Sequence, residues 1–101
     1  MPVVRVQAQL DVDLDEARRI VAAGIQRVSV SLDGAPSRTH DAFRGFPGSF
    51  DATLRGFDAL KRAGASMQVN VTITRLNVAE AESLLDLVQA RGADAFHVFI
   101  L

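Results

Sequence analysis

Residues 62–74 read RAGASMQVNVTIT and contain the transition that decides the fold. The stretch leads from the end of a helical segment through Gly64 into a strand in which apolar and polar residues alternate. Similar phrases, Ala-Ala-Gly at 22–24 and Ala-Arg-Gly at 90–92, also precede apolar or β-branched runs. Glycine adopts the left-handed conformation that ends a helix at little energetic cost. The chain is therefore predicted to repeat one helix–glycine–strand unit.

The remaining periodicity predicts seven elements in the order βαβαβαβ. Strands are predicted over residues 3–9, 27–32, 67–74 and 95–101, and helices over 14–23, 50–63 and 78–91. In the last helix the residues at inward-facing spacing are Ala81, Leu84, Leu85 and Val88. Strands that alternate with helices imply parallel strands joined by right-handed crossovers. The predicted fold class is α/β, a parallel sheet or barrel segment in a single domain over residues 1–101.

Length and composition exclude several classes of protein. The chain has 101 residues, 49% hydrophobic and 23% charged, which suits one folded domain and not a disordered chain. Its 11 Lys and Arg and 12 Asp and Glu give a net charge of -1, so neither nucleic-acid nor membrane-surface binding is expected. No apolar run approaches the roughly 20 residues that span a bilayer, and no signal segment opens the chain. A cytoplasmic location is therefore expected.

The second and third predicted strands each have one apolar and one polar face. The apolar positions are Val28, Val30 and Leu32 in one strand and Val69, Val71 and Ile73 in the other. The polar positions are Ser29, Ser31 and Asp33, then Gln68, Asn70, Thr72 and Thr74. An unpaired buried polar group costs about 1–3 kcal/mol, so the polar face is expected to line a water-accessible or ligand-filled interior. This favours a curved, barrel-like sheet. The alternative is an edge strand or a face left open by incomplete helix cover.

Four segments carry a resemblance to a known family. They are GIQRVSVSLDG at 24–34, HDAFRG at 40–45, GSFDATL at 48–54 and VNVTITRLN at 69–77. In this order and approximate spacing they resemble radical S-adenosylmethionine enzymes, especially the branch with SPASM-type auxiliary clusters that matures peptides and cofactors. The resemblance covers about residues 14–101. It implies that the sheet is half of a TIM-like partial barrel, and that the parent enzyme cleaves S-adenosylmethionine to a 5′-deoxyadenosyl radical.

The chain lacks the part of this family that holds the iron–sulfur cluster. Members bind a 4Fe-4S cluster through a CxxxCxxC loop after the first strand, and this chain contains no cysteine. That loop and a glycine-rich segment would lie upstream of Met1. The two histidines are too few for a metal site. We therefore expect no catalytic residue and no metal ligand in this chain, and no activity of the chain alone.

The resemblance implies two contacts to S-adenosylmethionine. Ser31, at the end of its strand, would lie near the ribose or the methionine part of the cofactor, and Asn70 would be a second contact. A hydroxyl and an amide both donate and accept hydrogen bonds without adding a charge, which suits sugar and carboxylate groups. The alternative for Ser31 is a hydroxyl whose hydrogen bonds are made within its own sheet.

Four further residues are candidates for the substrate side of the site. They are Asp33, Arg44, Gln68 and His97. Asp33 would accept hydrogen bonds, and Arg44 would offer a planar pair of donors to a carboxylate. The alternative for Asp33 is an Asx turn into Gly34, and the alternative for His97 is a core histidine bonded to a carbonyl. The substrate would be a peptide or a small molecule.

Two non-enzymatic functions compete with an enzyme segment. Asp11 and Asp13 after the first strand suggest a small receiver-like domain, but no lysine follows the last strand. The second alternative is a non-catalytic α/β binding or interaction module. The open sheet edges of a half-barrel favour self-association in such a module.

Overall fold

The computed structural model describes residues 3–6, 12–34 and 48–100. Its strands are β1 (Val3–Val6), β2 (Arg27–Ser31), β3 (Ser66–Ile73) and β4 (Ala95–Ile100). Its helices are α1 (Leu14–Ala22), α3 (Ser49–Arg62) and α4 (Ala81–Ala90), and a 3-10 turn, η1 (Val78–Glu80), precedes α4. None of these described helices combines the length and the apolar character that crossing a lipid bilayer requires. The strands form one parallel sheet in the order β1-β2-β3-β4, which confirms the predicted α/β class.

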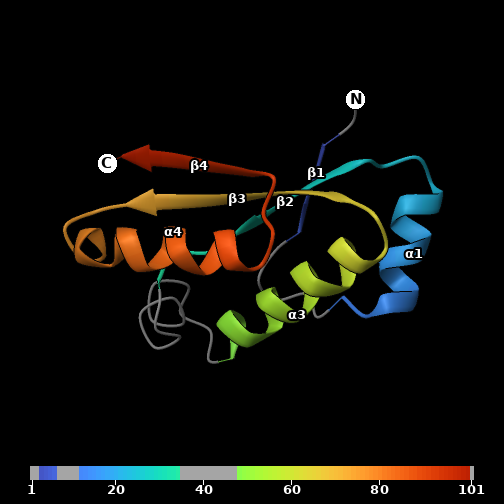
Figure 1. Ribbon diagram of the computed structural model, residues 1–101, viewed down its shortest axis with the longest axis horizontal. Helices are drawn as coiled ribbons and strands as arrows, with labels where there is room; N and C mark the ends of the chain where they lie inside the picture. Colours follow the sequence, from blue (N-terminus) through green and yellow to red (C-terminus); the bar gives the residue numbers. More distant parts are fainter. Residues whose placement is uncertain (1–2, 7–11, 35–47, 101) are drawn as a thin grey trace.

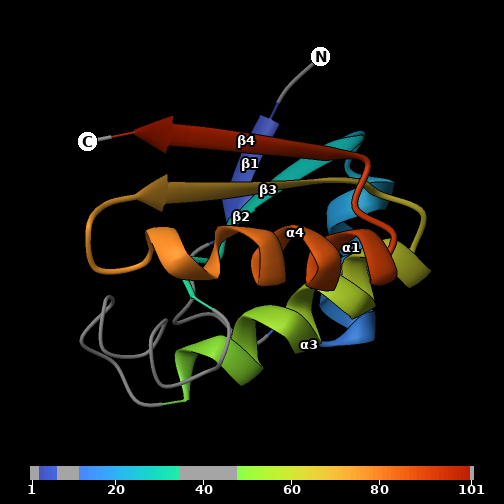
Figure 2. The same ribbon diagram turned by 60° about the vertical axis from the view of Figure 1, so that its left-hand side comes forward.

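The helices that the structure describes all cover one face of the sheet. Figure 2 shows α1, α3 and α4 below the strands, and Figure 1 shows the same arrangement from another direction. α1 packs beside α3, and α3 lies against β2 and β3. In an α/β barrel the helices form the outer layer and the other face of the strands points inward. The one-sided cover is that of a partial α/β barrel, as predicted.

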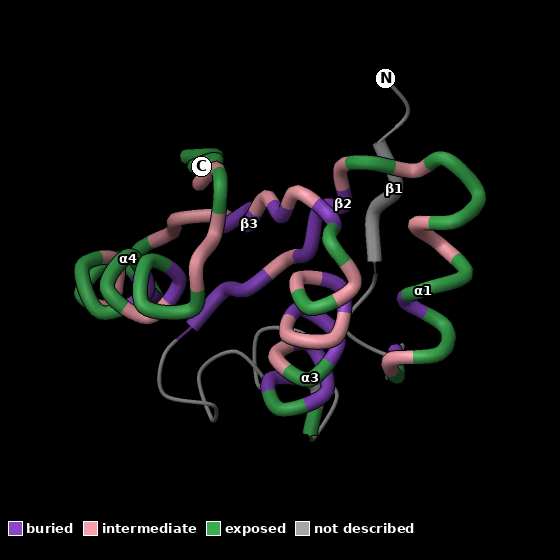
Figure 3. The backbone as a smooth tube through the Cα atoms, turned by 45° about the vertical axis from the view of Figure 1, so that its right-hand side comes forward, coloured by how far each residue is buried: buried purple, intermediate pink, exposed green. Residues whose placement is uncertain are grey.

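The hydrophobic core lies between the sheet and these helices. The strands contribute Val28, Val30, Met67 and Val69, each at most 1% exposed. The helices contribute Phe57 and Leu60 from α3 and Leu84 and Val88 from α4. Figure 3 shows buried backbone concentrated along β2, β3 and the inner side of α3. The apolar strand positions therefore face the helices, as the alternation predicted.

Glycines end the helices as the repeated phrase predicted. Gly24, Gly64 and Gly92 have φ values of 92°, 100° and 84°, in the left-handed region. After Gly64, the backbone N–H of Ala65 donates to the carbonyl of Leu60 at 3.0 Å, which closes the last turn of α3. The chain then enters β3 one residue later.

Two predicted details of the last helix are wrong. The segment predicted as one helix over 78–91 begins with the 3-10 turn η1, in which the N–H of Glu80 donates to the carbonyl of Asn77 at 2.9 Å. Leu85, predicted to point inward, is 37% exposed. Leu84 and Val88 are one turn apart and occupy the stripe that faces the sheet, and Leu85 lies about 100° further round the helix.

The start of α1 removes one support of the receiver-like alternative. Asp13 is the N-cap of α1, and its Oδ1 accepts from the N–H of Glu16 at 2.8 Å. The N–H of Asp13 in turn donates to Oε1 of Glu16 at 3.3 Å, which completes a capping box. Asp11 lies outside the described residues. Asp13 therefore has a local structural role at the start of a helix.

Candidate functional site

A row of three polar residues crosses the face of the sheet opposite the described helices. Ser31 of β2 is the register partner of Asn70 of β3, and Asn70 is the register partner of His97 of β4. Their chain neighbours Val30 and Val69 line a cavity on the helix side, so these three residues point to the other side. We call Ser31, Asn70 and His97 the polar row. The predicted side of the sheet is confirmed, and contact of the row with a cofactor stays a prediction.

Gln68 connects two members of the polar row. Its Nε2 donates to Oδ1 of Asn70 at 2.8 Å and lies 3.3 Å from Nδ1 of His97. With Nε2 of Gln68 as the donor, Nδ1 of His97 accepts, and the neutral imidazole carries its proton on Nε2. The ring of Phe99 packs edge-on against His97, with centroids 5.5 Å apart. These contacts orient the imidazole on the sheet surface.

Burial differs along the polar row. Asn70 is 6% exposed, Ser31 is half-buried, and His97 is exposed. The interpretation of His97 as a core histidine bonded to a carbonyl is therefore wrong. β4 lies at the edge of the described sheet, and the side chain of His97 contacts that of Gln68. On this face, the Ser31 hydroxyl and the His97 imidazole lie on either side of the Asn70 amide. Gln68 holds this amide in place through a hydrogen bond.

Asp33 lies beyond the end of β2 and bonds to the backbone of β3. Its side chain is buried at 1% exposure, and Oδ1 accepts from the N–H of Thr72 at 3.0 Å. The residue before it continues the strand pairing, since the N–H of Leu32 donates to the carbonyl of Asn70 at 2.9 Å. The Asp33 carboxylate therefore extends the contact between β2 and β3. Its predicted role toward the substrate is not tested by this placement and stays a prediction.

Asn77 is a site residue that the sequence analysis did not assign. Its side chain is completely buried, and its Nδ2 donates to the carbonyl of Asp33 at 2.9 Å and to that of Thr72 at 2.8 Å. Its Oδ1 accepts from the N–H of Thr74 at 2.7 Å. The only sequence signal was an asparagine at the end of the segment VNVTITRLN, shortly after a strand. One amide thus joins the carboxyl ends of two strands.

Arg44, the fourth substrate candidate, lies outside the described residues. The same holds for residues 35–47, most of the predicted long connection. The structure therefore brings together Ser31, Gln68, Asn70 and His97 on one face and leaves the position of Arg44 undetermined.

Two salt bridges lie at the end of the strands opposite the polar row. Oδ2 of Asp94 accepts from the N–H of Met67 at 2.8 Å and from Nζ of Lys61 at 3.0 Å. The Met67 N–H and then the Lys61 ammonium lower the pKa of Asp94 below its ordinary value of 3.8. Arg91 at the end of α4 pairs with Asp58 of α3. These interactions fasten the helices and the start of β4, away from the polar row.

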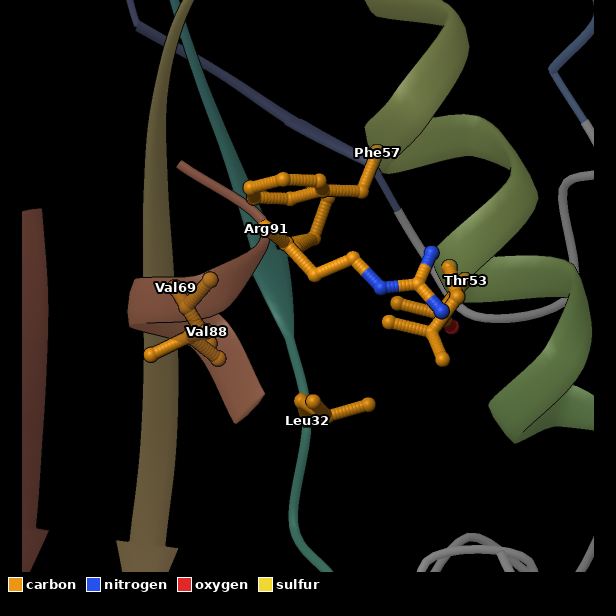
Figure 4. Close-up of a pocket in the computed structure, with 8 residues that line it drawn as sticks. Leu32, Thr53, Phe57, Val69, Val88 and Arg91 are labelled. Carbon is orange, nitrogen blue, oxygen red and sulfur yellow. The ribbon is translucent and has the colours of Figure 1, made fainter. Parts of the chain in front are cut away.

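A small cavity lies on the helix side and does not belong to the candidate site. Its volume is about 10 Å³, room for about one water molecule, and its lining is mostly apolar. Figure 4 shows Val69 of β3 beside Val88 of α4, Leu32 just after β2, Thr53 and Phe57 from α3, and the side chain of Arg91 extending toward Thr53. The hydroxyl of Thr53 is buried with no hydrogen-bond partner among the described residues. A cofactor-sized ligand does not fit here, so the open face is the candidate binding surface.

The residues present suit S-adenosylmethionine better than they suit an iron–sulfur cluster. The polar row offers neutral donors and acceptors that match sugar hydroxyls and a carboxylate. A 4Fe-4S cluster needs thiolate ligands, and the chain has no cysteine. Within the described ranges, no three His, Asp or Glu side chains are grouped to hold a metal ion. The cluster therefore does not fit the residues of this chain.

Comparison with known proteins identifies relatives over most of the chain, although no family model matches it. An AdoMet-dependent heme synthase of Methanosarcina barkeri is 46% identical over 83 residues, which are 82% of this chain and 24% of that protein. A protein of the same name from Nitratidesulfovibrio vulgaris is 42% identical over 87 residues, 86% of this chain and 24% of that protein. A mycofactocin maturase of Mycobacterium tuberculosis is 41% identical over 78 residues, 76% of this chain and 20% of that protein.

These relatives are considerably longer than the sequence described. The chain spans about a quarter of the length of the heme synthases that it matches. The similarity covers most of the residues that carried the resemblance to radical S-adenosylmethionine enzymes, and the relatives include both heme synthases and a mycofactocin maturase. Over this segment, the chain belongs to the radical S-adenosylmethionine family, in the branch that resembles the SPASM-type maturases.

Proposed function

We propose that this chain provides the strands that line the S-adenosylmethionine and substrate sites of a radical S-adenosylmethionine enzyme. The proposed parent enzyme matures a peptide or a cofactor, since the relatives are named as heme synthases and as a mycofactocin maturase. The observation that carries the proposal is the polar row on the face of a parallel sheet opposite the described helices. In the same type of barrel, ligands bind at the carboxyl ends of the strands. Ser31 is the last residue of β2, and Asn70 lies three residues before the end of β3.

Each member of the row has a proposed task. The Ser31 hydroxyl and the Asn70 amide bind the ribose or the methionine part of S-adenosylmethionine, because both form hydrogen bonds without introducing a charge. Gln68 of β3 and His97 of β4 face the substrate, and their contact with each other fixes the imidazole orientation. When bound and reduced, S-adenosylmethionine supplies a 5′-deoxyadenosyl radical in this family. Arg44 and Asp33 remain proposed contacts on the substrate side.

The proposal assigns no step of cofactor cleavage to this chain. Cleavage requires an electron from a cluster held by cysteines, and no cysteine is present. The cysteines that hold such a cluster would have to come from outside these 101 residues. Cofactor affinity of the chain alone is proposed to be low, since effective pockets bury about 70–90% of a ligand and an open sheet face buries less.

Binding of S-adenosylmethionine tests this proposal directly. Isothermal titration of the chain is expected to give weak but saturable binding. Ser31→Ala is expected to weaken it about two- to tenfold, the effect of one hydrogen bond. Ser83→Ala, which removes an exposed hydroxyl on α4, is the matched control and is expected to bind like the unchanged protein. Absence of saturable binding, or binding insensitive to Ser31→Ala, would refute the proposed site.

A second assay tests the proposed inactivity of the chain. After anaerobic incubation with iron, sulfide and a reductant, the chain is expected to produce no 5′-deoxyadenosine from S-adenosylmethionine. Production of 5′-deoxyadenosine at a rate above a protein-free control would contradict this part of the proposal. Binding and cleavage are thereby tested separately.

Exposed apolar residues on β4 favour self-association as the alternative function. Val98, Phe99 and Ile100 are 45%, 48% and 79% exposed, and β4 is an edge strand of the described sheet. Exposed apolar edge strands are prone to pair with another strand. Size-exclusion chromatography with light scattering would show a dimer or larger species, and Phe99→Glu would shift it to the monomer. A chain that is monomeric at all concentrations, with saturable cofactor binding, would favour the first function.

A further inference from the structure

We infer that Asn77 is a positioning residue, which holds the carboxyl ends of β2 and β3 in the geometry that the cofactor-binding face needs. The inference rests on the proposed function, because it concerns the arrangement of Ser31 and Asn70. Asn77 itself is completely buried and has no surface open to a ligand. It acts through the backbone carbonyls of Asp33 and Thr72, which lie shortly after Ser31 and Asn70 in the chain.

The hydrogen bonds of Asn77 make full use of an amide. Both donor positions of Nδ2 are occupied, by the carbonyls of Asp33 and Thr72. Oδ1 accepts from the N–H of Thr74. An aspartate of the same shape would lose both donors and place a carboxylate against two carbonyl oxygens, while an alanine would remove one buried and two part-buried hydrogen bonds to the backbone. No other residue type of this size supplies two donors and one acceptor.

The amide acts where the regular pairing of β2 and β3 stops. Ser31 and Asn70 form the last residue pair between β2 and β3, and β3 continues to Ile73 beside β4. Asp33 and Thr72, which Asn77 joins through their carbonyls, each lie two residues beyond this pair. Without the Asn77 amide, the two segments would still be joined beyond the polar row by the hydrogen bonds from Leu32 N–H to the Asn70 carbonyl and from Thr72 N–H to Asp33 Oδ1, but the carbonyls of Asp33 and Thr72 would lose their shared donor.

A second set of contacts ties the following turn to the same point. The N–H of Val78 donates to the carbonyl of Thr74 at 3.0 Å, and the N–H of Leu76 donates to Oγ1 of Thr74 at 3.1 Å. Asn77 thus fixes the turn that leads from β3 into η1 as well as the ends of the strands. The strand end, the turn and the following helix are held as one unit around a buried side chain.

Two variants separate positioning from general stability. Asn77→Ala removes the amide next to the polar row. Leu60→Val removes one methylene group from the core at the opposite end of β3, where the carbonyl of Leu60 accepts from the N–H of Ala65 just before that strand. Both variants are expected to lower the melting temperature. Titration with S-adenosylmethionine is performed at a temperature at which both variants are folded. Asn77→Ala is expected to weaken binding about tenfold, whereas Leu60→Val is expected to leave the affinity unchanged.

Amide hydrogen exchange gives a readout that does not depend on the ligand. In Asn77→Ala, the N–H groups of Thr72 and Thr74 are expected to exchange about tenfold faster or more, while the N–H of Met67 at the other end of β3 is expected to be unaffected. If Asn77→Ala does not fold, the side-chain amide protons of Asn77 in the unchanged protein are measured instead. Their exchange is expected to be slow, and exchange at the rate of a free amide would overturn the inference.

The outcomes distinguish the inference from the proposed function. If the unchanged protein does not bind S-adenosylmethionine, the proposed function fails and the ligand-related part of the inference fails with it. If the unchanged protein binds and Asn77→Ala binds equally well, the inference fails and the proposed function stands. Weaker binding together with local acceleration of exchange, and neither effect in Leu60→Val, supports both.

Discussion

Asp33 and Thr72 are joined by a hydrogen bond of 3.0 Å between the carboxylate oxygen Oδ1 of the first and the backbone N–H of the second. β2 ends at Ser31, whereas β3 continues to Ile73, so β3 extends past the point where β2 stops providing regular backbone partners. The carboxylate supplies an acceptor at this point. A residue expected to face the substrate therefore also completes the sheet.

Replacing Asp33 tests this structural role. Asp33→Ala leaves the Thr72 N–H without this acceptor and is expected to cost about 1–3 kcal/mol of unfolding free energy. Asp33→Asn keeps a side-chain oxygen and is expected to cost less. Urea denaturation measures both variants, with Asp86→Ala on the exposed side of α4 as a control that changes stability by about 0.5 kcal/mol or less. Equal losses for Asp33→Asn and Asp33→Ala would contradict the role of the oxygen.

Two glycine substitutions with opposite expectations compare a glycine at a helix end with one inside a helix. Gly64 has a φ of 100°, so Gly64→Ala is expected to lose about 1–2 kcal/mol, although nothing lies within 4 Å of the new Cβ. Gly56 lies inside α3, where a Cβ would meet the side chain of Val12 at an ordinary distance of 3.5 Å. Gly56→Ala is therefore expected to gain up to about 1 kcal/mol from helix propensity. Thermal unfolding followed by circular dichroism measures both; a stabilising Gly64→Ala would show that its backbone conformation is not as described.

The lowered pKa of Asp94 predicts a loss of stability in acid. The Met67 N–H and the Lys61 ammonium favour the ionised carboxyl in the folded state, so its contribution is fully present above the ordinary pKa of 3.8. The contribution disappears as the pH falls through the lower pKa of the folded state. The side chain is 40% exposed, so the Lys61 pair contributes about 1 kcal/mol at most.

Asp94→Asn isolates this contribution. At pH 7 the variant is expected to be less stable than the unchanged protein, and the difference is expected to shrink as the pH falls below the ordinary pKa of 3.8. Guanidinium denaturation at a series of pH values measures the difference. A difference that is constant over this range would show that the carboxylate charge is not its source.

The hydrogen bond between Gln68 and His97 predicts a preferred tautomer of the imidazole. In the unchanged protein the neutral ring is expected to carry its proton on Nε2, because Nδ1 accepts from Gln68 at 3.3 Å. Gln68→Ala is expected to shift the ring toward the mixture of tautomers seen in a free histidine. Long-range ¹H–¹⁵N correlation spectra of the imidazole report the nitrogen shifts, and identical spectra for the two proteins would rule out the interaction.

The sequence alone was enough to predict the architecture, because the features that determine it are local. The phrase at 62–64 and its two repeats mark helix ends, and the alternation through β2 and β3 predicts which residues face the helices. The side of the sheet on which Ser31 and Asn70 lie follows from the same alternation. A period of two residues is a property of any strand, so no tertiary contact was needed to predict it.

Only the tertiary structure decided which residues hold the candidate site together. Asn77 and Asp33 are 44 residues apart in the chain, and Asp33 and Thr72 are 39 apart, so no local pattern connects them. The exposure of His97 depends on the position of β4 at the edge of the described sheet, and that of Leu85 on the narrow stripe of α4 that reaches the sheet. Hydrogen-bond partners and burial are fixed by the packing of distant segments, whereas periodicity is fixed by the geometry of the backbone itself.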